Sequence, residues 1–284
     1  MTTRNEIEFS KFHGLGNDFL VARGRGLAGP LPDLARSICD RHFGLGADGL
    51  LIVLPPRLKK HDARVRFFNA DGSEAEMSGN GIRCVGAFLK GEGFRSGALK
   101  IETPAGVKSL RLVGVKQGMW IFRVSMGAPV LEPRKIPFGG VKGQGPVVGF
   151  RLPTQRGILP VTVTSMGNPH CSILVADFAR IDWTRLGQEI ENNSLFPHRT
   201  NVEFVRIISR KEIAVRFWER GVGQTSASGT GSCAAVVACV LNRRTSRKVR
   251  VRTVAGSLEV AWPKGGEVVL TGPVHMVARG TFYP

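Results

Sequence analysis

Hydrophobic and polar positions alternate in short stretches along most of the chain, and this pattern predicts strands. The clearest examples are "ARVRFFNA" and "IAVRFWER", each of which runs into a loop rich in Gly and Ser. Further strands are predicted at "GLLIVL", "SLRLVGV", "MWIFRVSM", "ILPVTVTSMG", "NVEFVRIISR", "SLEVAWP" and "EVVLTGPVHMVARG". The turn signal Lys116-Gln117-Gly118 separates two of them.

Two segments that follow the Gly/Ser loops have the character of helices. The first, "NGIRCVGAFLKGEG", ends on the stop signals Gly91 and Gly93, and the second, "GSCAAVVACVLNRR", is apolar on nearly every side. A helix without a polar face must be surrounded by protein. The pattern therefore predicts an α+β fold in which a curled sheet, or barrel, wraps around one central helix in each half of the chain.

The two halves resemble each other in sequence. Ser78 has a counterpart in Ser228, at an offset of 228 − 78 = 150, and the strand that starts at Val65 is echoed at Val215, again at 215 − 65 = 150. We interpret the chain as two pseudo-symmetric domains that arose by duplication. The predicted domains are residues 1–127 plus 272–284 and residues 128–271, with the Pro/Gly-rich segment 127–140 at the crossing.

Composition places the chain among globular proteins. Hydrophobic residues make up 42% and charged residues 22%, and no window approaches the roughly 18 apolar residues of a membrane span. The start, "MTTRNEIEF", does not have the pattern of an export signal, so a cytoplasmic location is expected. The five cysteines are odd in number and show no CxxC pair or zinc-like spacing, so we interpret them as reduced thiols and predict no metal site.

The formal net charge of +18 raises the question of an anionic partner. The densest basic cluster is Arg243, Arg244, Arg247, Lys248, Arg250 and Arg252. Aromatic residues that could stack on bases are not interleaved with it, and no DNA- or RNA-binding signature is visible. A solvated basic face is favoured over nucleic-acid binding.

The repeated Ser-Gly-x-Gly turns are the main candidates for chemistry. Each opens a helix, so the backbone N–H groups of Gly79, Asn80, Gly229 and Thr230 are predicted to be unpaired at the positive end of a helix dipole. If the pseudo-twofold brings the two turns to one cleft, that cleft suits a carboxylate or phosphate. The alternative is that Ser78 and Ser228 are only N-caps. The other glycine-rich match, Gly44-x-Gly46-x-x-Gly49, precedes a strand, so we interpret it as a turn and not as a dinucleotide site.

Six ordered motifs carry a family resemblance. They are "FSKFHGLGNDFLV", "RHFGLGADGLL", "FFNADGSEAEMSGNGIRC", "SMGNPHCSI", "FPHRTNVEF" and "WERGVGQTSASGTGSCAA". Together they resemble the diaminopimelate epimerase family from residue 9 to about residue 240. The resemblance implies two pseudo-symmetric halves, each around a central helix. It also implies a cofactor-independent isomerase that inverts the α-carbon of L,L-diaminopimelate to give meso-diaminopimelate, a precursor of lysine and peptidoglycan.

The resemblance also implies roles for individual residues. The N–H groups of Gly79, Asn80, Gly229 and Thr230 would hold the α-carboxylate and stabilise the charge that develops as the proton leaves. The substrate pocket would be lined by Asn17, Asn69, Asn168, Asn201, Glu219 and Arg220, and His170 matches the histidine of the site. The expected partner is a small amino-acid substrate, and the resemblance leaves a homodimer open.

One departure from the family concerns the catalytic positions themselves. Family members use two opposed cysteines, and here these positions are Ser78 and Ser228. Serine acts in enzymes when an adjacent base takes its proton, which assigns that role to His170 or Glu219. Four readings remain open: an epimerase with relayed serines, a racemase or isomerase of altered chemistry, a protein that binds the ligand without turnover, and an engineered pair of serines. We take the first as the working hypothesis.

Overall fold

A computed structural model describes residues 6–27, 29–141 and 143–284, which form two compact units. Unit 1 comprises residues 1–124 and 271–284, and unit 2 comprises residues 125–270. Residues 1–5, which begin the segment considered for an export signal, lie outside the described part. The domain boundaries predicted from the sequence lie between residues 127 and 128 and between residues 271 and 272. They were placed from the internal repeat and stay a prediction.

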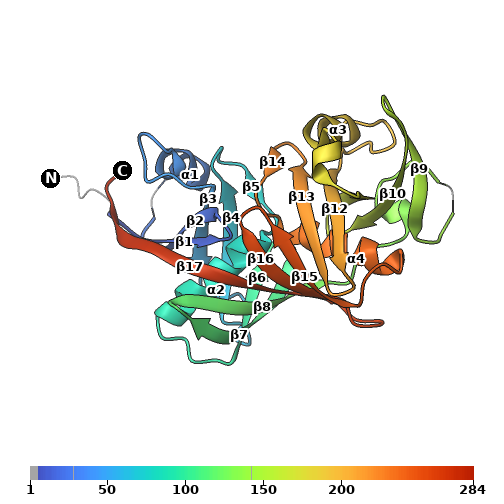
Figure 1. The fold of residues 1–284 in the computed structure, drawn as a ribbon. Coiled ribbons are helices and arrows are strands. Elements are labelled where there is room, and N and C mark those ends of the chain that lie inside the picture. Colours follow the sequence, from blue (N-terminus) through green and yellow to red (C-terminus); the bar gives the residue numbers. More distant parts are fainter. Residues whose placement is uncertain (1–5, 28, 142) are drawn as a thin grey trace. The chain divides into compact units, whose positions relative to one another are not determined.

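Unit 1 is a closed ring of strands with a helix inside (Figure 1). The ring order is β17-β1-β2-β3-β4-β6-β7-β8, and β8 pairs with β17 to close it. The strands are β1 (Ile7–Gly14), β2 (Asn17–Arg23), β3 (Gly49–Leu54), β4 (Ala63–Asn69), β5 (Glu74–Ala75), β6 (Ala98–Thr103), β7 (Gly106–Lys116), β8 (Met119–Gly127) and β17 (Val268–Phe282). The helices are α1 (Leu31–Cys39) and α2 (Gly79–Gly91).

Unit 2 has an equivalent series of paired strands around its own central helix. Its strands are β9 (Val147–Thr154), β10 (Gly157–Ser165), β11 (Pro169–Leu174), β12 (Asn201–Ser209), β13 (Glu212–Glu219), β14 (Gly223–Thr225), β15 (Lys248–Thr253) and β16 (Gly256–Ala261). Its helices are α3 (Trp183–Glu191) and α4 (Gly229–Leu241), with the short 3-10 turns η1 (Pro133–Lys135) and η2 (Phe178–Arg180).

The strand directions of the two units correspond. In unit 1, β2 pairs in parallel with β3, and β4 pairs in parallel with β6. The equivalent pairs of unit 2, β11 with β12 and β13 with β15, are also parallel, and each set is joined by antiparallel pairs. The predicted α+β class with two pseudo-symmetric halves is therefore confirmed.

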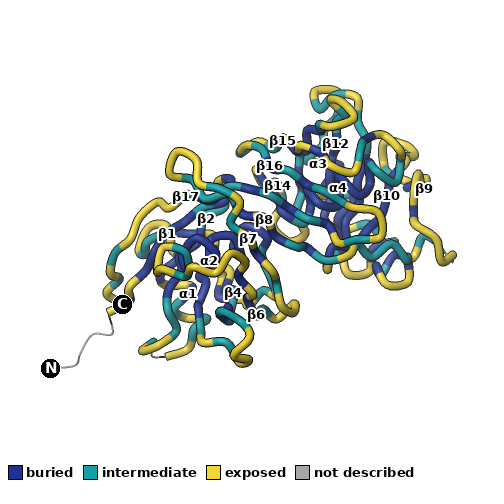
Figure 2. The backbone as a smooth tube through the Cα atoms, turned by 90° about the horizontal axis from the view of Figure 1, so that it is seen from below, coloured by how far each residue is buried: buried dark blue, intermediate teal, exposed yellow. Residues whose placement is uncertain are grey.

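The two central helices are buried as their sequences predict. Every residue of α2 from Gly79 to Leu89 is buried, and α4 is buried from Gly231 to Cys239 (Figure 2). Helix α2 ends at Gly91, and Gly93 follows with φ +90°, a left-handed conformation that favours glycine. The turn at Gln117 and Gly118 also has positive φ at both positions, which suits a two-residue hairpin.

The hydrophobic pattern did not predict helices α1 and α3. Each has 9 residues and buries only one face, through Ala35, Ile38 and Cys39 in α1 and through Leu186 and Ile190 in α3. A stretch of this length offers few turns over which a period of 3.6 residues can be recognised.

Candidate active site

Ser78 caps α2 in unit 1. Its backbone is extended, with φ −128° and ψ 126°, and its Oγ accepts a hydrogen bond from the Gly81 N–H at 3.0 Å. This bond satisfies one of the donors that a helix start leaves without an intrahelical partner. Gly79 and Asn80, predicted to grip a carboxylate, are the first two residues of the helix and are buried.

Asn17 lies beside this helix start. Its Oδ1 accepts from Asn80 Nδ2 at 3.1 Å, and its Nδ2 donates to Asp48 Oδ2 at 2.6 Å. The amide of Asn17 is therefore held at both ends. Asn69, at the end of β4, donates to Ser73 Oγ at 2.9 Å within its own turn and is exposed.

Ser228 caps α4 in unit 2 in the same conformation, with φ −133° and ψ 130°. Its Oγ accepts from the Gly231 N–H at 3.2 Å and donates to Glu219 Oε2 at 2.8 Å. Thr225 Oγ1 donates to the second carboxylate oxygen of Glu219 at 2.7 Å. One half-site thus joins its capping serine directly to a carboxylate.

The environment of Glu219 shifts its carboxyl toward the protonated form relative to a carboxyl in water. Burial raises the pKa of this carboxyl above its usual range, while the hydrogen bonds from Thr225 and Ser228 act in the opposite direction. A buried carboxylate with a raised pKa is a suitable proton acceptor near neutral pH. The predicted base therefore lies within hydrogen-bond reach of Ser228.

His170 lies in β11 and is fully buried. Its Nδ1 is 2.6 Å from Glu203 Oε1, and its Nε2 is 2.9 Å from Asn168 Oδ1. Both contacts are to oxygen, so both ring nitrogens donate when the ring is protonated. Ser172 Oγ donates to the other oxygen of Glu203 at 3.0 Å.

The side chain of Asn201 contacts the backbone of Arg220. The Asn201 side chain donates from Nδ2 to the Pro169 carbonyl at 2.9 Å and accepts from the Arg220 N–H at 3.0 Å. The Arg220 guanidinium donates to the His198 carbonyl at 3.1 Å. Gly229 is buried at the first position of α4, and Thr230 follows it, half-buried. Unit 2 thus carries Asn168, His170, Asn201, Glu219, Arg220 and Ser228 on neighbouring strands and the start of α4.

The native thiols lie in the core. All five cysteines are buried, and burial raises the pKa of Cys84, Cys39 and Cys239 to about 12. Cys84 and Cys233 lie in the core, where a thiol packs as a small hydrophobic side chain. A buried thiol of such high pKa does not supply a thiolate base.

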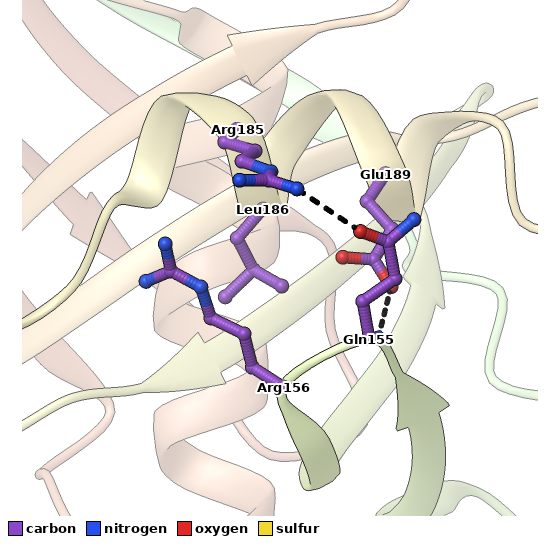
Figure 3. Close-up of a pocket in the computed structure, with 5 residues that line it drawn as sticks. All are labelled: Gln155, Arg156, Arg185, Leu186 and Glu189. Carbon is purple, nitrogen blue, oxygen red and sulfur yellow. Dashed lines mark hydrogen bonds between the residues drawn. The ribbon is translucent and has the colours of Figure 1, made fainter.

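A separate cavity of about 150 Å³ lies between α3 and the turn that joins β9 to β10 (Figure 3). It is lined by Gln155, Arg156, Arg185, Leu186 and Glu189. Gln155 N–H donates to Glu189 at 2.6 Å, and Arg185 donates to the Gln155 side chain at 3.3 Å. The lining includes no predicted site residue.

The basic cluster of β15 is largely matched by acidic neighbours. Glu212 accepts from Arg252 at 2.6 Å and lies 3.8 Å from Arg250, and Lys248 lies 3.1 Å from Glu259. Arg247 stacks over Trp262, with its guanidinium carbon 4.9 Å from the ring centre. The expectation that this face is solvated stays a prediction.

Among the described residues, the longest helices, α2 and α4, have 13 residues, fewer than the about 20 that a bilayer-spanning helix needs.

Three residues with a direct part in this geometry escaped the sequence analysis. They are Asp48, Glu203 and Arg83, and each stands inside a motif already quoted, in "GLGADGLL", "TNVEF" and "NGIRC". For Glu203 and Arg83, which are buried, a charged residue between apolar neighbours was the available signal, because charged residues are rarely buried without a specific partner. Asp48 is exposed and gave no such signal.

Known proteins match this chain over the ranges that contain the predicted site residues. A profile of the family described as "Diaminopimelate epimerase" matches residues 9–132 and 162–277, ranges that contain every predicted site residue. The "Diaminopimelate epimerase" of Desulfitobacterium hafniense is 46% identical over 280 residues, which cover 96% of this chain and 97% of that protein. That of Pelotomaculum thermopropionicum is 44% identical over 280 residues, with 97% and 99% covered.

A solved structure supports the fold. The chain is similar to a hydroxyproline epimerase from Agrobacterium vitis with bound trans-4-OH-L-proline, with a TM-score of 0.69 and 15% identity. The similarity covers 99% of this chain and 93% of that one. At this identity the likeness concerns the fold alone.

Proposed function

Because this chain belongs to the diaminopimelate epimerase family, we propose that it inverts the α-carbon of L,L-diaminopimelate to give meso-diaminopimelate without a cofactor. The observation that carries the proposal is the match to family members over nearly the full length of the chain. The fold of the two units, each with a serine-capped central helix, agrees with it.

Substrate binding is assigned to the two helix starts. The N–H groups of Gly79 and Asn80 in unit 1, and of Gly229 and Thr230 in unit 2, would donate to the α-carboxylate of one substrate molecule. The polar residues Asn17, Asn69, Asn168, Asn201, Glu219 and Arg220 would hold the remaining polar groups. That all these residues act on one substrate is part of the proposal.

The contact between Ser228 and Glu219 supplies a route for a proton. As the α C–H bond breaks, its proton passes to Ser228 Oγ, and the hydroxyl proton of Ser228 passes to Glu219. The electron pair stays on the substrate, where the carboxylate and its N–H donors stabilise it. Ser78 then delivers its hydroxyl proton to the other face of the carbon. Solvent returns a proton to Ser78 and removes one from Glu219. His170 stays the predicted alternative to Glu219 as the base.

The serines set a limit on the rate. A cysteine thiol has a pKa of about 8.5, and helix starts lower such values to about 3.5–7.5. An alcohol begins many pH units higher, and each unit is about 1.4 kcal/mol. A helix dipole contributes about 0.3–1 kcal/mol and up to about 2 in a partly buried site. We therefore expect turnover well below that of a thiol pair.

The direct test is solvent deuterium exchange. The protein is incubated with L,L- or meso-diaminopimelate in D₂O, and α-deuterium is followed by mass spectrometry. The proposal expects exchange that Glu219→Gln abolishes and that Glu212→Gln, a matched change at the other end of β13, leaves unchanged. Calorimetric binding of diaminopimelate with no exchange above background would show a binding protein and overturn the proposal.

A second test restores the thiols. Ser78→Cys combined with Ser228→Cys should raise the exchange rate by several orders of magnitude, because thiolates form near neutral pH at helix starts. Failure of the double variant to exchange, while it stays folded, would show that the pocket no longer suits the reaction.

The setting of the reaction belongs to the same proposal. We place it in the cytoplasm, since the five cysteines, interpreted as reduced thiols, suit a reducing compartment. A homodimer is testable by light scattering after gel filtration, and the location by fractionation of cells. Nucleic-acid binding is not part of the proposal. Steeply salt-dependent binding of DNA that is lost on substitution of Arg250 and Arg252 would contradict this.

A further inference from the structure

Arg83 places a guanidinium inside the first turns of α2. It is one of the largest fully buried side chains of the described residues, with 0% of its surface exposed. The side chain runs back toward the helix start, as the geometry of helical Cα–Cβ bonds favours. Nη1 donates to the Gly79 carbonyl at 2.9 Å, and Nη2 donates to Asn80 Oδ1 at 2.8 Å.

Two glycines make room for this group. A Cβ at Gly14 of β1 would lie 3.0 Å from Arg83 Nη2, and a Cβ at Gly272 of β17 would lie 3.2 Å from Arg83 Cζ. Both distances are tighter than ordinary contact between a Cβ and a neighbour. The barrel of unit 1 therefore has its guanidinium slot built from two strands that are far apart in the sequence.

Helix stability does not account for a cation at this place. The dipole makes the N-terminal end of a helix positive, so a basic side chain there is unfavourable, and burial adds a desolvation cost. The corresponding position of α4 is Cys233, since 233 − 83 = 150. Helix α4 begins with the same serine cap and carries no cation in its place, so a capped central helix forms without one.

Arg83 brings a positive charge to the start of α2, because a guanidinium stays protonated in proteins. Asp18, a carboxylate that acts on the adjacent Cys84, is itself engaged by Lys11 at 3.1 Å and by Arg41 at 2.9 Å. Arg83 lowers the pKa of the Cys84 thiol, although burial, the larger effect, raises it to about 12. The guanidinium thus acts on its neighbours as a charge.

We propose that Arg83 is a positioning residue that makes the start of α2 the stronger of the two helix starts assigned to the α-carboxylate. It holds Gly79 and Asn80 in place through its two hydrogen bonds and puts a full positive charge behind their N–H groups. The role presupposes carboxylate binding at this helix and so rests on the proposed function. The two halves then differ in character: the half-site of Ser78 favours negative charge, and that of Ser228 contains the acid Glu219.

The test uses an introduced thiol as a local probe of the electrostatic potential at the start of α2. In the full chain with Ser78→Cys, the thiol pKa is measured from thiolate absorbance near 240 nm and from the pH dependence of alkylation. The native thiols are buried and do not compete. Arg83→Gln removes the charge and keeps a hydrogen-bond donor. Arg83→Lys keeps the charge and loses the planar guanidinium that donates both hydrogen bonds. As a control, Lys90→Gln removes a charge at the far end of the same helix.

Arg83→Gln is expected to raise the pKa of the introduced thiol by about 1 to 2 pH units, the range for an opposite charge within about 6 Å. Arg83→Lys should change it by less than about half a unit, and Lys90→Gln should leave it unchanged. An unchanged pKa in Arg83→Gln, or a rise in Arg83→Lys as large as in Arg83→Gln, would overturn the proposal. If Arg83→Gln does not fold, the lysine variant alone decides, because a rise above one unit contradicts a role for the charge.

The same variants separate this proposal from the proposed function. The thiol pKa is measured without substrate, so a shift without epimerase activity would refute the proposed function and leave the electrostatic effect in place. In the active Ser78→Cys, Ser228→Cys background, Arg83→Gln should raise KM for diaminopimelate and lower kcat of exchange by about 10-fold or more. If KM and kcat both stay unchanged while the thiol pKa shifts, the charge does not contribute to binding of the carboxylate.

Discussion

The duplicated chain offers a matched experiment on its two capping serines. Ser78 and Ser228 cap helices of equal length and accept the same kind of backbone bond, at 3.0 and 3.2 Å. Only Ser228 also donates to a carboxylate, Glu219, at 2.8 Å. Ser78→Ala therefore removes a cap, and Ser228→Ala removes a cap together with a charge-assisted hydrogen bond.

The expected costs follow from these contacts. Loss of a serine cap costs about 0.5–2 kcal/mol. A hydrogen bond to a charged group contributes about 1.5–3 kcal/mol when its partner stays buried. We expect Ser78→Ala to lower the free energy of unfolding by about 1 kcal/mol and Ser228→Ala by about 2–5 kcal/mol. With Glu219→Gln in the background, the cost of Ser228→Ala should fall toward that of a cap alone.

The pH dependence of the free energy of unfolding tests the Ser228–Glu219 bond independently. The Ser228 hydroxyl lowers the pKa of Glu219, so its bond favours the carboxylate. Its contribution to stability is therefore present above the pKa of Glu219, which burial raises, and is lost as pH falls through that value. Urea unfolding followed by circular dichroism between pH 4 and 8 measures this. Equal costs for the two serines at all pH values would refute the assignment of the Ser228–Glu219 bond.

Three further predictions concern other contacts. Gly49→Ala should lower the free energy of unfolding by several kcal/mol, because a Cβ there would lie 2.5 Å from a backbone carbonyl oxygen, whereas Gly97→Ala, with open space around it, should not. Glu102 has a pKa lowered to about 2, chiefly by its hydrogen bond from His61, so its contribution to stability is present above about pH 4.3 and lost as pH falls toward 2; Glu102→Gln should flatten acid unfolding over that interval. Glu203→Gln weakens the 2.6 Å contact with its histidine partner, and should move the ring nitrogen resonances of that histidine in NMR spectra and the pH profile of exchange together.

Local pattern and internal repetition allowed most of the fold to be predicted. The alternation in "ARVRFFNA" and the apolar run of "GSCAAVVACVLNRR" report which face of each element is buried, and burial depends on the residues of that element. The offset of 150 residues between Ser78 and Ser228 then indicated two equivalent halves, and the paired parallel and antiparallel strands confirm them. The 9-residue helices α1 and α3 are too short for their period to be recognised.

The sequence by itself determined the helix starts, their serine caps and the family, because these depend on residues that are neighbours in the chain or on motifs in a fixed order. Only the tertiary structure decided which of the predicted residues contact one another. The bond between His170 and Glu203 joins residues 33 apart, and the slot of Arg83 needs Gly272 from the last strand. Such contacts arise from strand pairing and barrel closure, and the spacing of residues along a chain does not specify which side chains these bring together.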